Sequence, residues 1–247
     1  MNSCVVCVEC RSQRLAEGTG RQMRANIQQV SDTAVRVQFG SAIDPALTYI
    51  LLDFVYRLEV QNIIGITHWE FTYTTATVHF EPWRVAGTEV MQQLREICRT
   101  ISIDGMQKSG REIEVPVCYG YEYGPDLDDV AQFHEISCDD VIKRHVAPVY
   151  PVAFIGFAPG FPYLIGLNPS LEMPRLTTPR LRVAAGSVGI GGSQTGIYPN
   201  ASPAGWRIIG RTPLRLFDKT KDPASLCQAG DTLRFVPIDR EQFQEYR

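Results

Sequence analysis

The sequence lacks the features that define several common classes of protein. Its 247 residues carry a formal net charge of only −3, so the whole molecule has no electrostatic attraction for nucleic acid or for a membrane surface. It contains four histidines, none of them in an H-x-x-x-H spacing, and we expect no metal site. We therefore predict that neither nucleic acid nor a membrane is a partner.

Charge is also missing from one long stretch, residues 148–167, with the sequence PVYPVAFIGFAPGFPYLIGL. Its length and apolarity are typical of a membrane span, but four prolines and three glycines interrupt it. A proline inside a helix removes a backbone hydrogen bond and costs about 3 kcal/mol, and lipid offers no replacement partner. The stretch therefore predicts a buried strand over 149–157 that continues into a rigid, uncharged loop.

The seven cysteines do not have the pattern of a disulfide framework. Three of them, Cys4, Cys7 and Cys10, have the spacing of an iron–sulfur motif, but Arg14 stands where the fourth ligand belongs. Residues 1–23 lack the apolar core of a signal peptide, and we expect them to be a disordered extension. The expected location is cytoplasmic, because the other cysteines are scattered singly, as reduced thiols are: Cys98, Cys118, Cys138 and Cys227.

Charge is distributed unevenly along the second half of the chain. Residues 112–140 contain nine acidic and no basic residues, whereas residues 172–221 contain eight basic and two acidic ones. The basic segment fits a small anionic ligand or a partner surface. Alternatively, the two segments neutralise each other within one domain, and the sequence leaves both interpretations open.

The apolar pattern of the first half predicts a small α+β domain over 24–105. Residues 34–39 alternate between apolar and polar side chains, as a half-buried strand does. Asp44 followed by Pro45 is a helix start, residues 69–80 predict a hairpin, and a second helix is expected over 88–101. The order strand, strand, helix, strand, strand, helix is that of a small α+β unit, and residues 104–110 predict a linker.

The second half consists of short β patterns separated by glycine and proline. Two short helices are expected, one opened by residues 124–126 and one by Ser137, which forms a capping-box pattern with Asp140. No long amphipathic helix follows residue 149. Short β patterns separated by glycine and proline predict a closed or nearly closed β-barrel domain over 112–240. Together with the small α+β domain before it, this gives α+β as the predicted fold class.

One segment, residues 185–196, is rich in glycine and has the sequence AGSVGIGGSQTG. It lacks the lysine of a Walker A motif and does not open a helix, as a dinucleotide-binding fingerprint must. Two interpretations remain open. The glycines could let backbone N–H groups approach an anion, or they could form tight corners of the barrel.

No residues have the arrangement of a nucleophile with its base. His145 is a weak catalytic candidate because it precedes the uncharged stretch and could lie at the rim of its loop; it could equally serve the C-terminal end of a helix. That loop, with its backbone and aromatic contacts, contributes Gly156, Phe157, Pro159, Gly160 and Phe161. The remaining candidates combine arginine guanidinium groups, which can bind a carboxylate or phosphate in bidentate fashion, with amide groups, hydroxyl groups and planar aromatic rings. They predict a pocket for a small, flat, polar or anionic substrate, built from Arg180, Arg182, Ser187, Gln194, Tyr198, Trp206 and Arg211.

Several segments together resemble one known family. They are GFAPGFPYLIGL (156–167), PRLTTPRLRV (174–183), AGSVGIGGSQTGIYP (185–199) and SPAGWRIIGRTP (202–213). Their order is similar to that of the family of KipI and the B subunit of 5-oxoprolinase, also called allophanate hydrolase subunit 1-like. Two positions depart from the family pattern, because Ala184 stands where proline is usual and Ala204 where glycine is usual.

The resemblance implies a cyclophilin-like β-barrel for the C-terminal domain. It also implies a role as the B subunit of an ATP-dependent 5-oxoprolinase, which cleaves 5-oxo-L-proline to L-glutamate. The implied partners are the C subunit, which is allophanate hydrolase subunit 2-like, and the A subunit; the complex uses ATP, and this chain is expected to be inactive alone. Two alternatives remain: an inhibitor of a sensor histidine kinase, as in KipI, and the carboxyltransferase component of a biotin-dependent urea- or allophanate-type enzyme.

Overall fold

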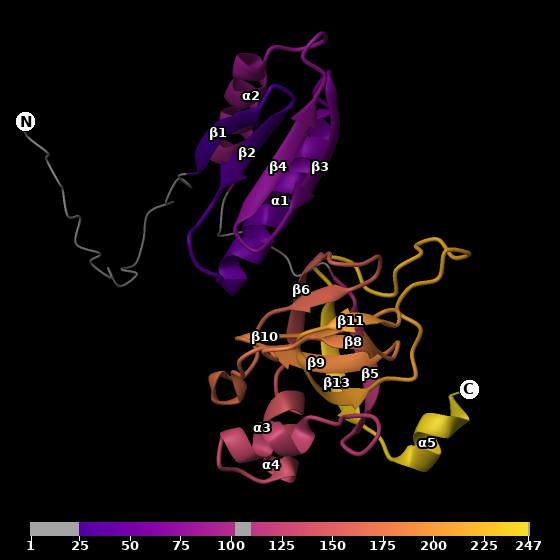
Figure 1. Ribbon diagram of the computed structural model, residues 1–247. Helices are drawn as coiled ribbons and strands as arrows, with labels where there is room; N and C mark the ends of the chain where they lie inside the picture. The colour runs from indigo at the N-terminus through magenta and orange to yellow at the C-terminus, as the bar shows by residue number, and fades with distance from the viewer. Residues whose placement is uncertain (1–24, 102–109, 247) are drawn as a thin grey trace, which may run out of the picture.

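The computed structural model describes residues 25–101 and 110–246. The expected extension over 1–23 and most of the expected linker lie outside this part of the chain. The described residues form two bodies, a sheet with two helices and a barrel, drawn one above the other in Figure 1. Each body has its own hydrophobic core, and the predicted α+β fold class is confirmed.

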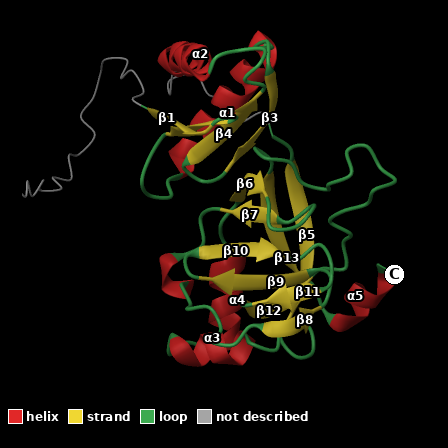
Figure 2. Cartoon of the chain, turned by 45° about the horizontal axis from the view of Figure 1, so that its top comes forward, coloured by secondary structure: helices red, strands yellow, loops and turns green. Residues whose placement is uncertain are grey.

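The first body is an antiparallel sheet in the strand order β1–β2–β4–β3. Both helices lie on the same side of the sheet (Figure 2), where their apolar faces share one core with the strands. Helix α1 begins as predicted, because the Asp44 side chain accepts a hydrogen bond from the backbone N–H of Ala46 at 2.8 Å. The elements are β1 (Asn26–Ser31), β2 (Ala34–Gln38), α1 (Pro45–Gln61), β3 (Ile66–Phe71), β4 (Thr75–Phe80) and α2 (Gly87–Thr100).

The second body is a closed seven-stranded barrel in the order β10–β7–β6–β13–β5–β12–β9. Only the β13–β5 pair is parallel. The strands are β5 (Glu112–Tyr119), β6 (Tyr150–Ile155), β7 (Pro162–Leu164), β9 (Ser187–Gly191), β10 (Gln194–Ile197), β12 (Arg207–Arg211) and β13 (Thr232–Pro237).

Smaller elements cover the barrel. Strands β8 (Arg180–Val183) and β11 (Ser202–Ala204) form a separate two-stranded sheet. The two predicted short helices, α3 and α4, pack at the lower end of the barrel in Figure 1. The remaining elements are α3 (Leu127–Phe133), α4 (Cys138–Val146), the 3-10 turn η2 (Pro169–Leu171) and α5 (Arg240–Glu245).

The uncharged stretch contains two strands rather than one strand and a loop. The strand expected over 149–157 is shorter, Tyr150–Ile155, and part of the expected loop forms β7, which pairs with β6. Proline is tolerated at the first residue of β7, as it is at strand starts generally. Among the described residues, none of the helices has the length and apolarity that crossing a membrane requires.

Four carboxylates of the acidic segment form ion pairs with arginines that lie later in the chain. Two of those arginines belong to the basic segment, so part of the uneven charge is neutralised within this body. The pairs are Arg180–Asp126 at 2.6 Å, Arg207–Asp129 at 3.0 Å, Arg234–Glu112 at 2.7 Å and Arg240–Glu122 at 2.8 Å.

Candidate binding site

The glycine-rich segment forms the β9–β10 hairpin, whose two faces differ. Its β-branched residues point into the barrel core, whereas the outer face carries glycines. A Cβ atom added to Gly191 would lie 2.5 Å from the indole ring of Trp206, and one added to Gly196 would lie 3.1 Å from the ring of Phe161. These glycines let aromatic rings lie directly against the strand backbone, a role that neither sequence interpretation anticipated.

Other glycines of the same segment do lie in turns. Gly186 and Gly192 have φ angles of +83° and +63°, which glycine adopts without steric cost. Gly192 lies in the two-residue turn between β9 and β10. The corner interpretation is therefore right for these two positions only.

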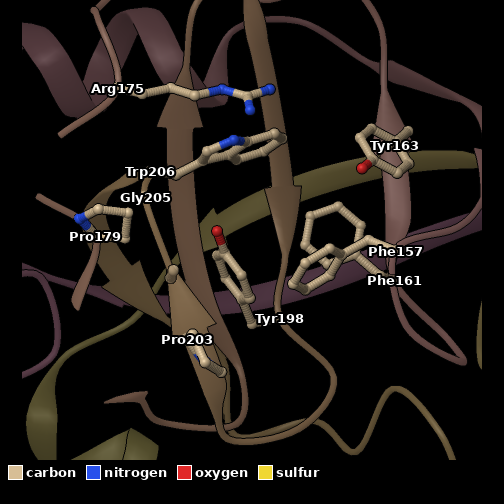
Figure 3. A pocket seen from close by; sticks show the side chains of 10 residues that line it. Phe157, Phe161, Tyr163, Arg175, Pro179, Tyr198, Pro203, Gly205 and Trp206 are labelled. Carbon is tan, nitrogen blue, oxygen red and sulfur yellow. The ribbon is translucent and has the colours of Figure 1, made fainter. Parts of the chain in front are cut away.

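The rings on the outer face surround a cavity of about 200 Å³ (Figure 3). The ring of Phe161 meets Trp206 and Tyr198 edge-on, with centroids 5.6 and 5.2 Å apart. Such edge-to-face contacts fix the orientation of each ring. The cavity is lined by Phe157, Phe161, Tyr163, Arg175, Pro179, Tyr198, Pro203, Ala204, Gly205 and Trp206.

Arg175 is the only charged residue of this lining. Its guanidinium carbon lies 5.9 Å from the centroid of the Trp206 ring, within the range of a cation–π contact, and Figure 3 shows it on one side of that ring. Within residues 25–101 and 110–246, Arg175 forms no ion pair with a carboxylate. A cation beside apolar rings and without a partner is suited to an anionic group of a ligand.

Two tyrosine hydroxyls complete the polar part of the pocket. Burial raises the pKa of Tyr198 to about 12, a hydrogen bond to the Trp206 backbone opposes this rise, and so does the charge of Arg175. Burial also raises the pKa of Tyr163, again opposed by Arg175. Both hydroxyls therefore stay protonated at neutral pH and are able to donate hydrogen bonds.

The structure brings together only part of the predicted site. Phe157, Phe161, Tyr198 and Trp206 line the cavity, whereas the remaining predicted residues do not. Ser187 is buried on β9 and Gln194 is half-buried at the start of β10. The other three loop residues, Gly156, Pro159 and Gly160, do not line the cavity. Gly160 is buried against the backbone of Leu216 and the side chain of Phe217.

The predicted arginines Arg180, Arg182 and Arg211 do not line this cavity. The guanidinium of Arg180 donates two hydrogen bonds, of 2.7 and 2.6 Å, to the buried carboxylate of Asp126. Its bidentate fork is thus already occupied by the protein. Arg182 is exposed on β8, and Arg211 donates to the carbonyl oxygen of Ala185 at 2.8 Å.

His145 lies inside the barrel and not at the rim of the loop. It is completely buried, and burial lowers its pKa to about 3. The Thr195 hydroxyl donates its only hydrogen to the carbonyl of Gly189 at 3.0 Å, so it must accept from Nε2 of His145, also at 3.0 Å. Nδ1 then accepts from the Tyr119 hydroxyl at 2.9 Å. Both ring nitrogens of this neutral histidine are occupied, and it does not line the cavity, an arrangement typical of a structural residue.

Sequence reasoning missed Arg175 as a residue of the cavity, and no local pattern marks it. It also missed four smaller lining residues, Pro179, Pro203, Ala204 and Gly205. One usable signal was present in residues 187–191, SVGIG, where glycine alternates with β-branched residues. That alternation indicates a strand that carries side chains mainly on one face, because a glycine follows each β-branched residue and lies on the other face.

Comparison with known proteins identifies the family. Residues 25–227 match the family described as "Carboxyltransferase domain, subdomain C and D". The chain belongs to this family. It is 35% identical over 239 residues to the 5-oxoprolinase B subunit of Bacillus subtilis (strain 168), covering 91% of this chain and 98% of that protein. It is 50% identical over 219 residues to the 5-oxoprolinase B subunit of Escherichia coli O157:H7, covering 87% and 96%. The resemblance inferred from the sequence is confirmed.

Solved structures agree with this assignment. A protein designated TTHA0988 superposes with a TM-score of 0.73 at 29% identity, over 83% of this chain and 40% of that longer chain. The conserved protein PH0987 from Pyrococcus horikoshii gives a TM-score of 0.54 at 40% identity, over 88% of this chain and all of that one. Urea carboxylase of Kluyveromyces lactis shares the fold, with a TM-score of 0.71 at 20% identity over 90% of this chain and 22% of that chain.

Proposed function

We propose that this chain is the B subunit of an ATP-dependent 5-oxoprolinase, which cleaves 5-oxo-L-proline to L-glutamate together with the A and C subunits. The observation that carries the proposal is the match, over nearly their full length, to relatives that bear the name of the 5-oxoprolinase B subunit. The proposed location is the cytoplasm. The free thiols of Cys98, Cys118, Cys138 and Cys227 support it, because thiols stay reduced there.

The aromatic pocket is the proposed binding site for 5-oxoproline. This substrate is a small ring that carries a carboxylate and a lactam. The cavity of about 200 Å³ is more than ten times the about 10–15 Å³ that one water molecule requires on the same measure, so it has room for such a ring. In the proposed pose the carboxylate pairs with Arg175, the ring lies between the aromatic walls, and the tyrosine hydroxyls donate to the lactam oxygen.

The same lining supports the proposal that the chain is inactive alone. Among the residues that line the pocket there is no carboxylate, histidine or thiol. The tyrosines are protonated at neutral pH because burial raises their pKa, so neither serves as a general base. The pocket holds and orients a ring, and in the proposed complex the groups that react with it come from another polypeptide.

The glycine-rich segment does not fit the triphosphate of ATP. Its backbone groups are already paired, since Gly186 N–H donates to the Tyr198 carbonyl and Gly192 N–H to the Met173 carbonyl, both at 2.7 Å. The outer face of Gly191 and Gly196 is covered by aromatic rings. We therefore do not assign ATP to this segment.

Reconstitution tests the proposed function. The purified chain, mixed with the A and C subunits, ATP and 5-oxo-L-proline, is expected to produce L-glutamate, and omission of the chain is expected to abolish the product. Equal glutamate production with and without the chain would contradict the proposal. The chain incubated alone with ATP and substrate serves as the control for activity without partners.

A second candidate function is that of the carboxyltransferase component of a biotin-dependent enzyme. The description of the matching family favours it. This function requires a biotinylated carrier, whereas the proposed ring opening does not. Loss of activity on addition of avidin to the reconstituted system would therefore favour the second candidate.

A further inference from the structure

Tyr73, in the turn between β3 and β4, connects the first body to the wall of the pocket. Its ring meets Phe154 edge-on, with centroids 4.8 Å apart, and Tyr163 edge-on at 5.9 Å. Phe154 and Tyr163 are themselves stacked at 4.4 Å. Tyr163 lines the pocket, while Tyr73 and Phe154 do not. Tyr73 therefore supports, from behind, a side chain that would touch the ligand.

We propose that Tyr73 is a positioning residue, through which the first body holds the Tyr163 wall of the pocket in place. Three aromatic rings from two bodies form one small apolar cluster at this point, together with Phe71, Ala153 and Ile165. Rings packed edge-on restrict each other's rotation. Removal of the Tyr73 ring leaves Tyr163 with only its neighbours Phe154, Phe161 and Trp206 from the second body, and its orientation is then less restricted.

The hydroxyl of Tyr73 is not explained by packing. Its oxygen is buried and has no hydrogen-bond partner among the described residues. A buried hydroxyl without a partner costs free energy, and phenylalanine would fill the same space without that cost. Burial and the neighbouring Tyr163 raise the pKa of Tyr73, and the charge of Arg175 opposes this rise. The ring, and not the hydroxyl, is the part that this inference assigns to positioning.

The two bodies also touch at a second point, whose residues belong neither to the aromatic cluster nor to the pocket lining, and this point offers a control. A Cβ atom added to Gly230 would lie 3.2 Å from Cδ1 of Leu52 in α1. Leu52→Ala weakens this contact between the bodies without touching the aromatic cluster. If Leu52→Ala leaves the pocket unchanged, an effect of Tyr73→Ala is due to the loss of the contact with Tyr163 and not to weaker packing between the two bodies.

Fluorine NMR on the full chain, with 3-fluorotyrosine at position 163, tests the inference without a ligand. Tyr73→Ala is expected to shift or broaden the fluorine signal, whereas Tyr73→Phe and Leu52→Ala leave it unchanged. An unchanged signal in Tyr73→Ala would overturn the inference. So would an equal change in Leu52→Ala, which would assign the effect to docking, or in Tyr73→Phe, which would assign it to the hydroxyl.

A kinetic measurement extends the test and rests on the proposed function. In the reconstituted enzyme, Tyr73→Ala is expected to raise the KM for 5-oxoproline about ten-fold, equivalent to about 1.4 kcal/mol, with little change in kcat. A drop in kcat at constant KM would contradict a positioning role. Absence of activity with the unaltered chain would refute the proposed function, and the fluorine signal would still decide the role of Tyr73.

Discussion

The inner and outer faces of the β9–β10 hairpin show two different uses of neighbouring residues. On the inner face, Thr195 bonds to His145 and to the Gly189 carbonyl, and every hydrogen of that buried network has an acceptor. On the outer face, the adjacent Gly196 has no side chain, and the ring of Phe161 covers it. The inner face is filled by the protein's own side chains, whereas the rings that cover the outer face line a cavity.

Two arginines, five residues apart, repeat this contrast. Arg180 is held by two hydrogen bonds to the buried carboxylate of Asp126. Arg175 lies over Trp206 at the cavity, with no carboxylate partner among the residues that the structure describes. An arginine in a family motif is therefore informative about ligand binding only after its partners within the protein are known.

The inner face is expected to be the more sensitive to substitution. His145→Leu should lower the free energy of unfolding by about 3 kcal/mol, because the Tyr119 hydroxyl then loses its buried partner and the packing around the ring changes. Urea denaturation at pH 7.5 measures the change. Tyr150→Phe, which removes only the 2.6 Å bond to the His145 carbonyl, should cost about 1 kcal/mol. A loss for His145→Leu no larger than that of Tyr150→Phe would show that the network is not what stabilises the inner face.

The outer face should tolerate no added methyl group beneath Trp206. Gly191→Ala is expected to destabilise the protein by about 2 kcal/mol, because its Cβ would collide with the indole ring and force it away. The same urea titration, followed by the fluorescence of the three tryptophans, reports this change. Gly205→Ala is the matched control, since its nearest neighbour would be 3.8 Å away, and it should change stability by less than about 0.5 kcal/mol. Equal effects of the two substitutions would contradict the assigned role of Gly191.

The buried histidine also predicts how stability depends on pH. His145 has a pKa of about 3 in the folded chain and 6.5 in the unfolded chain, so between these values only the unfolded chain binds the proton. Stability is therefore lost as the pH falls below 6.5. Between pH 7.5 and 5.5 this contributes a loss of about 1.4 kcal/mol.

The difference between the unaltered chain and His145→Leu isolates this contribution. Because the leucine variant lacks the titrating group, the stability gap between the two proteins should narrow by about 1.4 kcal/mol from pH 7.5 to 5.5. Urea titrations at both pH values measure the gap. A constant gap would mean that the folded protein takes up the proton as readily as the unfolded chain.

Local patterns predicted most of the elements but not how distant ones combine. The Asp44 cap, the hairpin over 69–80 and the Ser137 cap depend on neighbouring residues, and all three appear in the structure. The parallel pairing of β13 with β5 joins residues more than a hundred positions apart, and no local signal specifies it. Strand β1, with mostly polar side chains, was part of the predicted order of elements, but no residues were assigned to it.

The binding site was predicted in part for the same reason. The aromatic residues Phe161, Tyr198 and Trp206 were identifiable from composition and motif, and they do meet at one cavity. Whether an arginine is free depends on a carboxylate elsewhere in the chain, as Asp126 is for Arg180. The burial of His145 likewise depends on strands that follow it by about fifty residues, such as the one that carries Thr195.

The central claim is that the outer face of the barrel binds a small carboxylate through Arg175. The most direct measurement compares the KM for 5-oxoproline of the reconstituted enzyme containing Arg175→Gln with that containing Arg182→Gln, which removes the same charge from an exposed position seven residues away. Arg175→Gln is expected to raise KM about ten-fold or more, and Arg182→Gln less than about two-fold. Equal values for the two variants, or a larger effect of Arg182→Gln, would contradict the account.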